Sequence, residues 1–157
     1  MSDFENQQIR KMDRPVSEFT DKVVEVKRVS KKTKGGNQIH FTALVVTGDK
    51  KSRVGVGLGK AKSVADAIQK AINKGRKSMI TVNIVNGTIT DSVTLKFKGG
   101  IILIRPGKEG SGLIAGGSVR SVVELAGIKD IVSKIIGSKT KSINVWATVK
   151  ALSKLQK

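Results

Sequence analysis

The chain has 157 residues, of which 38% are hydrophobic and 27% are charged, enough for one domain or two small ones. It contains no cysteine and one histidine, which excludes disulfides, thiol nucleophiles and thiolate or His-cluster metal sites and leaves little for acid–base catalysis. Thirty Lys and Arg against twelve Asp and Glu give a net charge of +18. The excess positive charges repel one another in a lone compact molecule, so the composition predicts a polyanionic partner. Nucleic acid is the first expectation.

The sequence contains no apolar run near the roughly 20 residues that a membrane-spanning helix needs. The first five residues are polar and acidic apart from Met1 and Phe4, without the apolar segment of a signal peptide. We therefore expect a cytoplasmic protein that acts without a membrane, a metal, a cofactor or a small-molecule substrate.

The N-terminal half is expected to begin with a flexible arm over residues 1–20, which lack hydrophobic periodicity. Alternating apolar residues then predict strands over 22–30, 38–46 and 53–58.

The third of these strands has two unlike faces. Val54, Val56 and Leu58 share one face, and the other face is made of Gly55, Gly57 and Gly59. A bare glycine face predicts that another element packs closely against the backbone.

A change of period from two to 3.6 then predicts an amphipathic helix from about Ser63 to Lys74. Ser63 is expected to cap its N-terminus and Gly75 to end it. Its inward stripe consists of Val64, Ala67, Ile68, Ala71 and Ile72. Three strands and a helix form a complete small α+β unit, and we place a domain boundary near residues 75–80.

The second half repeats the mixture of strands and helices. Residues 129–136 fit either a strand or a helix, and both readings stay open. The other predicted elements are strands over 79–85, 92–97 and 101–105, a helix from Ser118 closed by Gly127, and a final helix over 142–155.

Two glycine-rich stretches raise the question of phosphate binding. Gly55–Lys60 lacks the glycine spacing of a dinucleotide fold and of a P-loop, so a closely packed strand is favoured there. Gly110–Gly117 precedes a helix, as in some small-molecule kinases, but a kinase also needs magnesium ligands, and the nearest acids are Glu109 and Glu124. We expect this loop to bind an RNA phosphate or a partner protein.

The densest basic run extends from Lys27 to Lys34, contains no acid, and leads into two glycines. We expect the segment Arg28–Gly36 to be a mobile hairpin loop that contacts RNA. Aromatic residues are only 3% of the chain, so contacts to phosphate and recognition of RNA shape are favoured over base stacking. The predicted RNA-binding residues are Lys27, Arg28, Ser30, Lys31, Lys32, Lys34, Gly35, Gly36, Lys50, Lys51, Arg53, Lys60 and Lys62.

Two other side chains each allow two interpretations. His40 alternates with apolar neighbours and is expected on an exposed or rim position of its strand, with RNA contact as the alternative. Trp146 has helical spacing from Val149 and is expected to be half-buried, with base stacking as the alternative.

Several motifs, in order along about residues 20–155, resemble the bacterial family of ribosomal small-subunit protein five. They are Arg28–Lys31, Lys34–Gly36, Phe41–Asp49, Arg53–Lys62, Ala67–Ala71, Gly110–Arg120 and Val123–Asp130.

The resemblance implies an α+β chain of two small domains. Residues 21–78 would form a domain like those that bind double-stranded RNA, and residues 79–157 a βαβ-type domain whose fold some small-molecule kinases share. The implied function is a structural constituent of the small ribosomal subunit, not an enzyme. It would bind the subunit's ribosomal RNA and its proteins four and eight. It would contribute to subunit assembly and to translational accuracy near the decoding region and the path by which messenger RNA enters.

The resemblance also implies roles for particular residues. Val29, Ser30 and Lys31 would border the spectinomycin site. Gly112 and Arg120 would meet ribosomal protein four, Gly112 because it has no room for a side chain and Arg120 by pairing with a carboxylate.

The chain departs from the family pattern at 88–91, at 137–144 and at Trp146. Two alternatives stay open at this point. One is a free-standing RNA chaperone or regulator built on the same domain, and the other is a nucleotide-dependent kinase, which rests on fold analogy alone.

Overall fold

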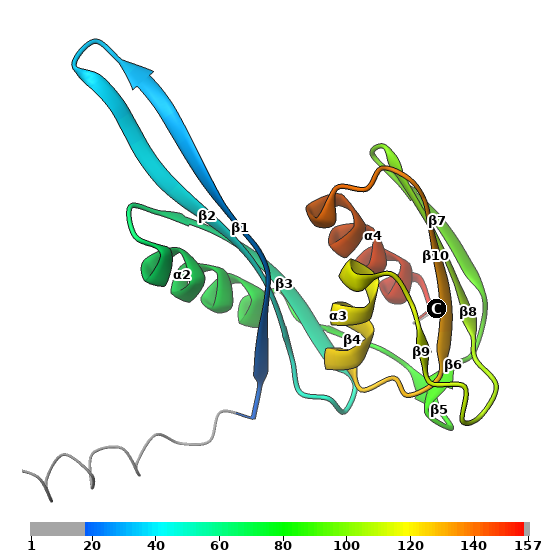
Figure 1. Ribbon diagram of the computed structural model, residues 1–157. Helices are drawn as coiled ribbons and strands as arrows, with labels where there is room; N and C mark the ends of the chain where they lie inside the picture. Colours follow the sequence, from blue (N-terminus) through cyan, green and yellow to red (C-terminus); the bar gives the residue numbers. More distant parts are fainter. Residues whose placement is uncertain (1–17, 156–157) are drawn as a thin grey trace, which may run out of the picture.

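The computed structural model describes residues 18–155 (Figure 1). Its fold class is α+β, as predicted. The elements in chain order are β1 (Thr20–Thr33), β2 (Gly36–Gly48), β3 (Arg53–Ala61), α2 (Val64–Lys77), β4 (Ile80–Thr81), β5 (Ile84–Val85), β6 (Thr88–Ile89), β7 (Val93–Phe97), β8 (Gly100–Pro106), β9 (Leu113–Ile114), α3 (Gly117–Ala126), β10 (Ile131–Gly137) and α4 (Lys141–Lys154).

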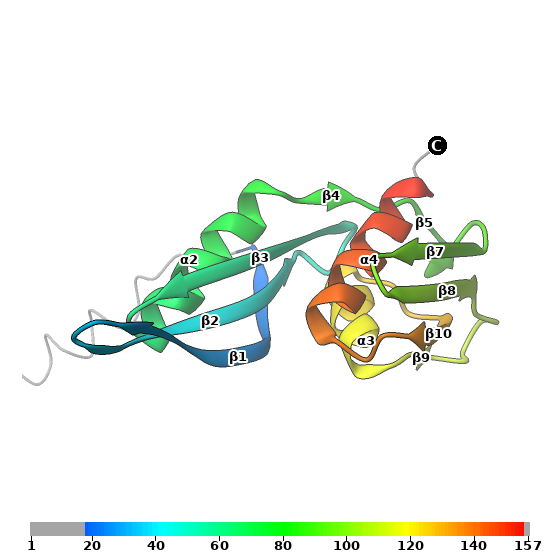
Figure 2. The same cartoon turned by 90° about the horizontal axis from the view of Figure 1, so that it is seen from above.

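The elements stack in four layers. Helix α2 covers one face of an antiparallel sheet of order β1-β2-β3-β4, and α3 and α4 lie against its other face (Figures 1 and 2). A second sheet of order β7-β8-β10-β9 covers the far side of α3 and α4. The tip of the β1–β2 hairpin extends beyond all four layers (Figure 1).

The two sheets share one hydrophobic core. Leu44 and Val46 of β2 and Val54 and Val56 of β3 are buried in the same cluster as the inward residues of α3, α4, β8 and β10. Leu58 lies on the same face of β3 but is 43% exposed, because it lies farther toward the free end of the sheet. The inner face of β3 is therefore buried only where the helices reach it.

The glycine face of β3 packs against α2, as predicted. A Cβ atom at Gly55, Gly57 or Gly59 would collide with a carbonyl oxygen of the helix backbone. Ala67 and Ala71 of α2 are fully buried beside it. Small residues on both elements thus bring the helix and strand backbones into contact, and no ligand is needed to explain the bare strand.

The start of α2 is as predicted and its end is not. Ser63 caps the helix by accepting a hydrogen bond from the Asp66 N–H at 3.2 Å. The prediction that Gly75 ends the helix is wrong, because the helix continues to Lys77 and Ser78 caps it. Gly75 is instead buried beside Thr47 and Gly57, where a side chain would not fit. On the predicted inward stripe, Val64 is 38% exposed because the first turn projects past the sheet.

The prediction of one strand over 79–85 is also wrong. Its first part, β4, pairs with β3, whereas its second part, β5, pairs with β6 in a separate small sheet. The two are separated at Val82, which is buried and donates its N–H to the Ser52 carbonyl at 2.7 Å. The β5–β6 turn is Asn86-Gly87, both with positive φ, which is the typical two-residue hairpin signal.

The rest of the second half follows the βαβ expectation. Strand β9 pairs in parallel with β10, and α3 connects them. The segment 129–136, left open between strand and helix, forms β10. Gly127 closes α3 with φ of 88°, and α4 begins and ends within a residue of its predicted bounds.

Most of the predicted N-terminal arm, residues 1–17, lies outside the described residues, and Thr20 is already part of β1. Within residues 18–155, no helix is long and apolar enough to cross a membrane.

Candidate nucleic-acid interface

The predicted loop Arg28–Gly36 is a paired hairpin in the structure, so its description as a loop is wrong. Strands β1 and β2 stay in register from Lys27 opposite Thr42 to Thr33 opposite Gly36. Only two residues, Lys34 and Gly35, form the turn. The Thr33 hydroxyl donates a hydrogen bond to the Gly36 carbonyl at 2.7 Å and closes the tip. Backbone pairing orders this segment although no side-chain core covers it.

The hairpin presents its predicted RNA-binding residues on two faces. Side chains alternate along a strand, and directly paired residues point to the same side. Arg28, which pairs with Phe41, therefore lies on the α2 side together with Ser30 and Lys32. Lys27, Val29 and Lys31 lie on the opposite side. The hairpin is a finger with cationic side chains on both of its faces.

Two further predicted residues join this finger at its base. Lys60 is opposite Thr42 on β3, and Thr42 is opposite Lys27 on β1, so the two lysines lie on one face across three strands. Lys62 immediately precedes Ser63, the N-cap of α2, and is exposed. We call Lys27–Gly36, Lys60 and Lys62 the hairpin group.

The remaining predicted residues lie at the other end of the sheet. Lys50 and Lys51 belong to the turn between β2 and β3, which touches the C-terminal end of α3, and Arg53 is the first residue of β3. The Lys50 N–H donates to the Leu125 carbonyl at 3.0 Å. The structure therefore does not bring these three residues together with the hairpin group.

Asp49 organises this second turn. One carboxylate oxygen accepts hydrogen bonds from the N–H groups of Lys51, Ser52 and Arg53 at 2.9, 3.0 and 2.9 Å. The other accepts from the Arg53 side chain at 2.9 Å. Burial by itself raises the pKa of the Asp49 carboxyl, but these hydrogen bonds together outweigh it and hold that pKa well below its usual range. Arg53 is thus ion-paired with Asp49 although its side chain is 45% exposed, and Lys50 and Lys51 are exposed as well.

Ion pairs leave the tip of the hairpin group uncompensated. Within residues 18–155, the basic side chains in ion pairs are Lys22, Lys27, Arg53 and Arg76. Lys31, Lys32 and Lys34 are exposed and pair with no acid of that range. Since exposed like charges repel one another, the tip gains from an anionic partner.

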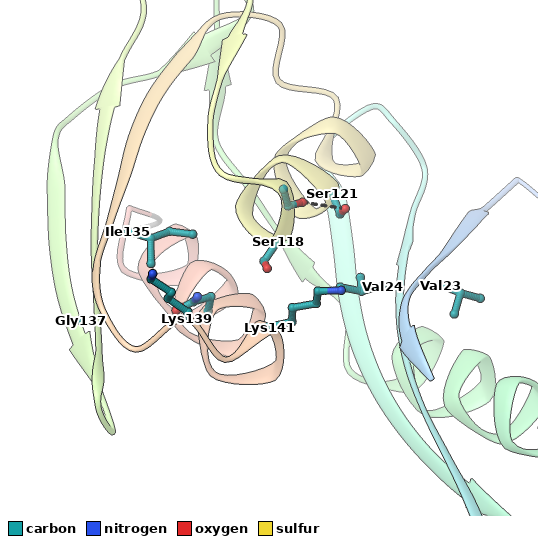
Figure 3. A pocket seen from close by; sticks show the side chains of 10 residues that line it. Val23, Val24, Ser118, Ser121, Ile135, Gly137, Lys139 and Lys141 are labelled. Atoms are coloured by element: carbon teal, nitrogen blue, oxygen red, sulfur yellow. Dashed lines mark hydrogen bonds between the residues drawn. The ribbon is translucent and has the colours of Figure 1, made fainter. Parts of the chain in front are cut away.

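A cavity between the two sheets contains cationic residues that sequence reasoning missed. It has a volume of about 720 Å³ and is lined by β1, α3, the end of β10 and the start of α4 (Figure 3). Lys141 extends across it toward Val24 of β1, and Lys139 lies on the side of β10, near Ile135 (Figure 3). The lysines are visible in the sequence, but β1 lies more than a hundred residues away, so only the tertiary structure assembles this cavity.

The glycine-rich loop before α3 is held by an internal carboxylate. Asp130, 8% exposed, accepts a hydrogen bond from the Gly112 N–H at 2.7 Å. The prediction that Gly112 has no room for a side chain is wrong, because no atom lies within 4 Å of a Cβ placed there. Its constraint is a φ of +71°, which disfavours other residues. Arg120 is exposed on the first turns of α3, one turn before Glu124.

The predicted exposure of His40 and the predicted partial burial of Trp146 are both confirmed. His40 is partly exposed on β2 opposite Val29, and Trp146 is partly buried against the shared core. Residues 18–155 contain no cluster of three or more His, Cys, Asp or Glu side chains that could hold a metal ion.

Comparison with known proteins gives two successive family matches, separated by residues 84–94. The family model described as "Ribosomal protein S5, N-terminal domain" matches residues 19–83, and the model for the C-terminal domain of the same protein matches residues 95–157. The chain is also 48% identical over 139 residues to proteins named "Small ribosomal subunit protein uS5" from Campylobacter jejuni strains 81-176, 81116 and RM1221. Each alignment covers 88% of this chain and 95% of the relative.

Proposed function

The chain belongs to the ribosomal protein S5 family, and on this premise we propose that it contributes to assembly of the small ribosomal subunit and to accurate decoding. As a member of this family it is a structural protein of the small subunit that binds ribosomal RNA, rather than an enzyme. The proposal concerns which surfaces it uses and which neighbours it meets.

The hairpin group is the proposed main RNA contact. The observation that carries this proposal is a two-sided hairpin tip that is cationic, exposed and without acids. A flat basic face could neutralise phosphates of one RNA segment only. A finger with cations on both faces can lie between two segments and neutralise phosphates of each. Such a contact would hold two parts of the RNA at a defined distance, which is what an assembly protein does.

RNA binding by the isolated protein tests this proposal. If about eight phosphates are neutralised, the logarithm of the affinity falls with the logarithm of salt concentration at a slope of roughly −6 to −7. A slope near −1 would mean that the charge excess does not hold the complex. Sedimentation at dissociating salt separates the ribosomal role from that of a free-standing RNA chaperone, since only a subunit component stays with the small subunit.

The glycine loop and α3 are the proposed contact with ribosomal protein four. Arg120 is exposed, and its planar guanidinium group can donate two hydrogen bonds to a carboxylate of the partner. Gly112 needs its positive φ to keep the loop bonded to Asp130. The substitutions Gly112→Arg and Arg120→Leu should both loosen this interface and raise misreading in a translation assay. Unchanged fidelity in both variants would contradict this placement. Ribosomal protein eight is the second proposed protein neighbour.

Residues Val29, Ser30 and Lys31 are proposed to border the spectinomycin site. They are consecutive on β1, so Ser30 lies on one face of the hairpin and its two neighbours lie on the other. Changes here would therefore act indirectly, by shifting RNA segments that the finger separates. The measurement is the spectinomycin sensitivity of cells that carry Lys31→Glu. If sensitivity is unaltered while RNA binding is weakened, the hairpin tip acts in subunit assembly and not at the spectinomycin site.

A further inference from the structure

The turn of the β5–β6 hairpin contains two residues that can react with each other. In a peptide chain, the backbone nitrogen that follows an asparagine can attack the asparagine side chain. Glycine favours this attack because it has no side chain in the way and adopts many backbone conformations. Asn86 is followed by Gly87, and no other asparagine of this chain is followed by glycine. Asparagine and glycine are also the residues that the positive φ values of this turn favour, so the turn chemistry and the reactive pair coincide.

Both reacting groups are free of other partners. Asn86 is exposed, and within residues 18–155 neither its side-chain amide nor the Gly87 N–H forms a hydrogen bond. The hairpin has only two residue pairs, Ile84 with Ile89 and Val85 with Thr88. A two-stranded hairpin of this length is weakly stabilised and opens locally. The fold therefore does not keep the Gly87 nitrogen away from the Asn86 side chain.

The Gly87 carbonyl, in contrast, is fully engaged. It accepts hydrogen bonds from the N–H groups of Lys129 and Asp130 at 2.8 and 3.1 Å. The Asp130 carboxylate in turn accepts from the Gly112 N–H at 2.7 Å. A short series of hydrogen bonds thus connects the β5–β6 turn with the glycine loop before α3.

We propose that Asn86 is a modification site, where spontaneous deamidation produces isoaspartate and thereby loosens the glycine loop around Gly112. The inference goes beyond the proposed function and does not depend on it, because both the reaction and its effect on the loop belong to the isolated chain.

The reaction needs only water. The Gly87 nitrogen forms a bond to Cγ of Asn86 and gives up its proton, while the bond from Cγ to the side-chain nitrogen breaks and ammonia leaves. The product is a five-membered succinimide ring. Water then cleaves one of the two bonds between the Gly87 nitrogen and the ring carbonyls. Cleavage at Cγ gives aspartate, and cleavage at the backbone carbonyl carbon gives isoaspartate, so one water is consumed and one ammonia is released without an oxidant or a reductant.

The two products differ in their effect on the backbone. Isoaspartate carries the main chain through Cβ and Cγ and so adds one backbone atom to a turn of two residues, whose geometry is narrowly defined. The Gly87 carbonyl then no longer faces the N–H groups of Lys129 and Asp130, and the support of Asp130 for Gly112 is weakened. Aspartate adds the same negative charge without the extra atom and should leave these hydrogen bonds in place.

Ageing of the purified chain tests the reaction. After incubation at neutral pH and physiological temperature, trypsin releases residues 78–96 as one peptide that contains both Asn86 and Asn83. Asn83 is also exposed and is the internal control, because it precedes the branched Ile84. Since a branched side chain crowds its own backbone nitrogen, Asn86 should deamidate at least about tenfold faster than Asn83, as measured by mass spectrometry. An isoaspartyl methyltransferase with a labelled methyl donor should detect isoaspartate. Equal rates at the two asparagines, or deamidation without isoaspartate, would overturn the proposal.

Hydrogen exchange tests the effect on the loop. Exchange of the Gly112 amide should accelerate by about tenfold or more in the aged, isoaspartate-containing chain. Aged Asn86→Gly should keep the rate of the fresh chain, because Gly-Gly suits the same turn and lacks the side-chain amide. Fresh Asn86→Asp should also keep that rate, since it has the charge without the inserted atom. Unchanged exchange in the modified chain, or equal acceleration in either variant, would overturn the link between the turn and the loop.

Discussion

The tip and the base of the β1–β2 hairpin belong to one continuous ladder and have opposite environments. At the base, Val45 and Val46 are fully buried, one against α2 and the other in the core shared with α3 and α4. At the tip, Lys31, Lys32 and Lys34 are exposed on strands that no other layer covers. Backbone pairing is the same in both parts, so it is burial of side chains that distinguishes them.

This difference separates stability from function within one element. Changes at the base should act on the free energy of unfolding, because removing or crowding buried groups is costly. Changes at the tip should act on binding to RNA, because exposed lysines contribute little to a fold. Substitutions at the base and at the tip should therefore differ in their effect on stability.

The largest effect is expected at the glycine face of β3. In Gly57→Ala, the new methyl group would collide with the Ala71 carbonyl, so the helix and strand must separate along their contact. We expect a loss of about 3 kcal/mol or more in the free energy of unfolding, measured by urea denaturation. Gly35→Ala at the tip, where no atom lies within 4 Å, should change it by less than about 0.5 kcal/mol. Similar losses of stability in the two variants would contradict the expected difference between the buried glycine face and the exposed tip.

The junction between the two sheets should be the next most sensitive site. Gly127 has φ of +88°, and a Cβ atom there would also meet the Lys50 carbonyl of the β2–β3 turn. Gly127→Ala should therefore lower the free energy of unfolding by about 2 kcal/mol or more. Gly110→Ala separates the two causes, since Gly110 has a similar φ of +80° and open space around it. Gly110→Ala should lower the free energy of unfolding by only about 1 kcal/mol, which is the contribution of backbone strain at positive φ.

Acidification should reveal the contribution of Asp49 at the base. Its pKa is lower in the folded protein than the value of about 3.9 in an unfolded chain, so it stabilises the fold above that pH. This stabilisation is lost as the pH falls below about 4 and the carboxyl group becomes protonated. Asp49→Asn should be less stable than wild type by about 1 to 2 kcal/mol at pH 7. Urea denaturation at pH 7 and pH 3 should show the gap closing, and a gap independent of pH would contradict the role of its charge.

The smallest effect on stability is expected at the tip. The double variant Lys31→Glu with Lys32→Glu should leave the free energy of unfolding within about 0.5 kcal/mol of wild type. Its RNA affinity should fall, and the salt slope should become less steep by roughly two, one for each lost phosphate contact. Lys108→Glu with Lys129→Glu makes the same charge change outside the hairpin group and serves as the control. Loss of stability with unchanged RNA affinity would make the tip structural.

Several parts of the fold could be predicted because neighbouring residues decide them. The alternation in β2 and β3, the serine cap of α2 and the glycine closing α3 are local signals, and each corresponds to an observed element. The β5–β6 hairpin could also have been predicted, since Asn86-Gly87 is a strong turn signal that sequence reasoning passed over. In the candidate site, the identity of the cationic residues was likewise visible in the sequence.

Other features depended on partners distant in the chain. Gly75 reads as a helix end, yet α2 continues through it, and its bare backbone packs beside Thr47 of β2 and Gly57 of β3. Residues 79–85 read as one strand, yet each half pairs with a different partner. The basic run after Lys27 reads as a loop, yet β2 extends far enough to pair with it up to Thr33.

The amino-acid sequence by itself determined the fold class, the positions of most elements and a charge that requires an anionic partner, because composition and period depend on each residue and its near neighbours. Only the tertiary structure decided where that charge lies. It divided the predicted RNA-binding residues between the hairpin group and the distant β2–β3 turn, where Arg53 is held by Asp49. It also left one face of the second sheet uncovered. The physical reason is that burial and exposure are set by which layers pack together, and no local pattern records that choice.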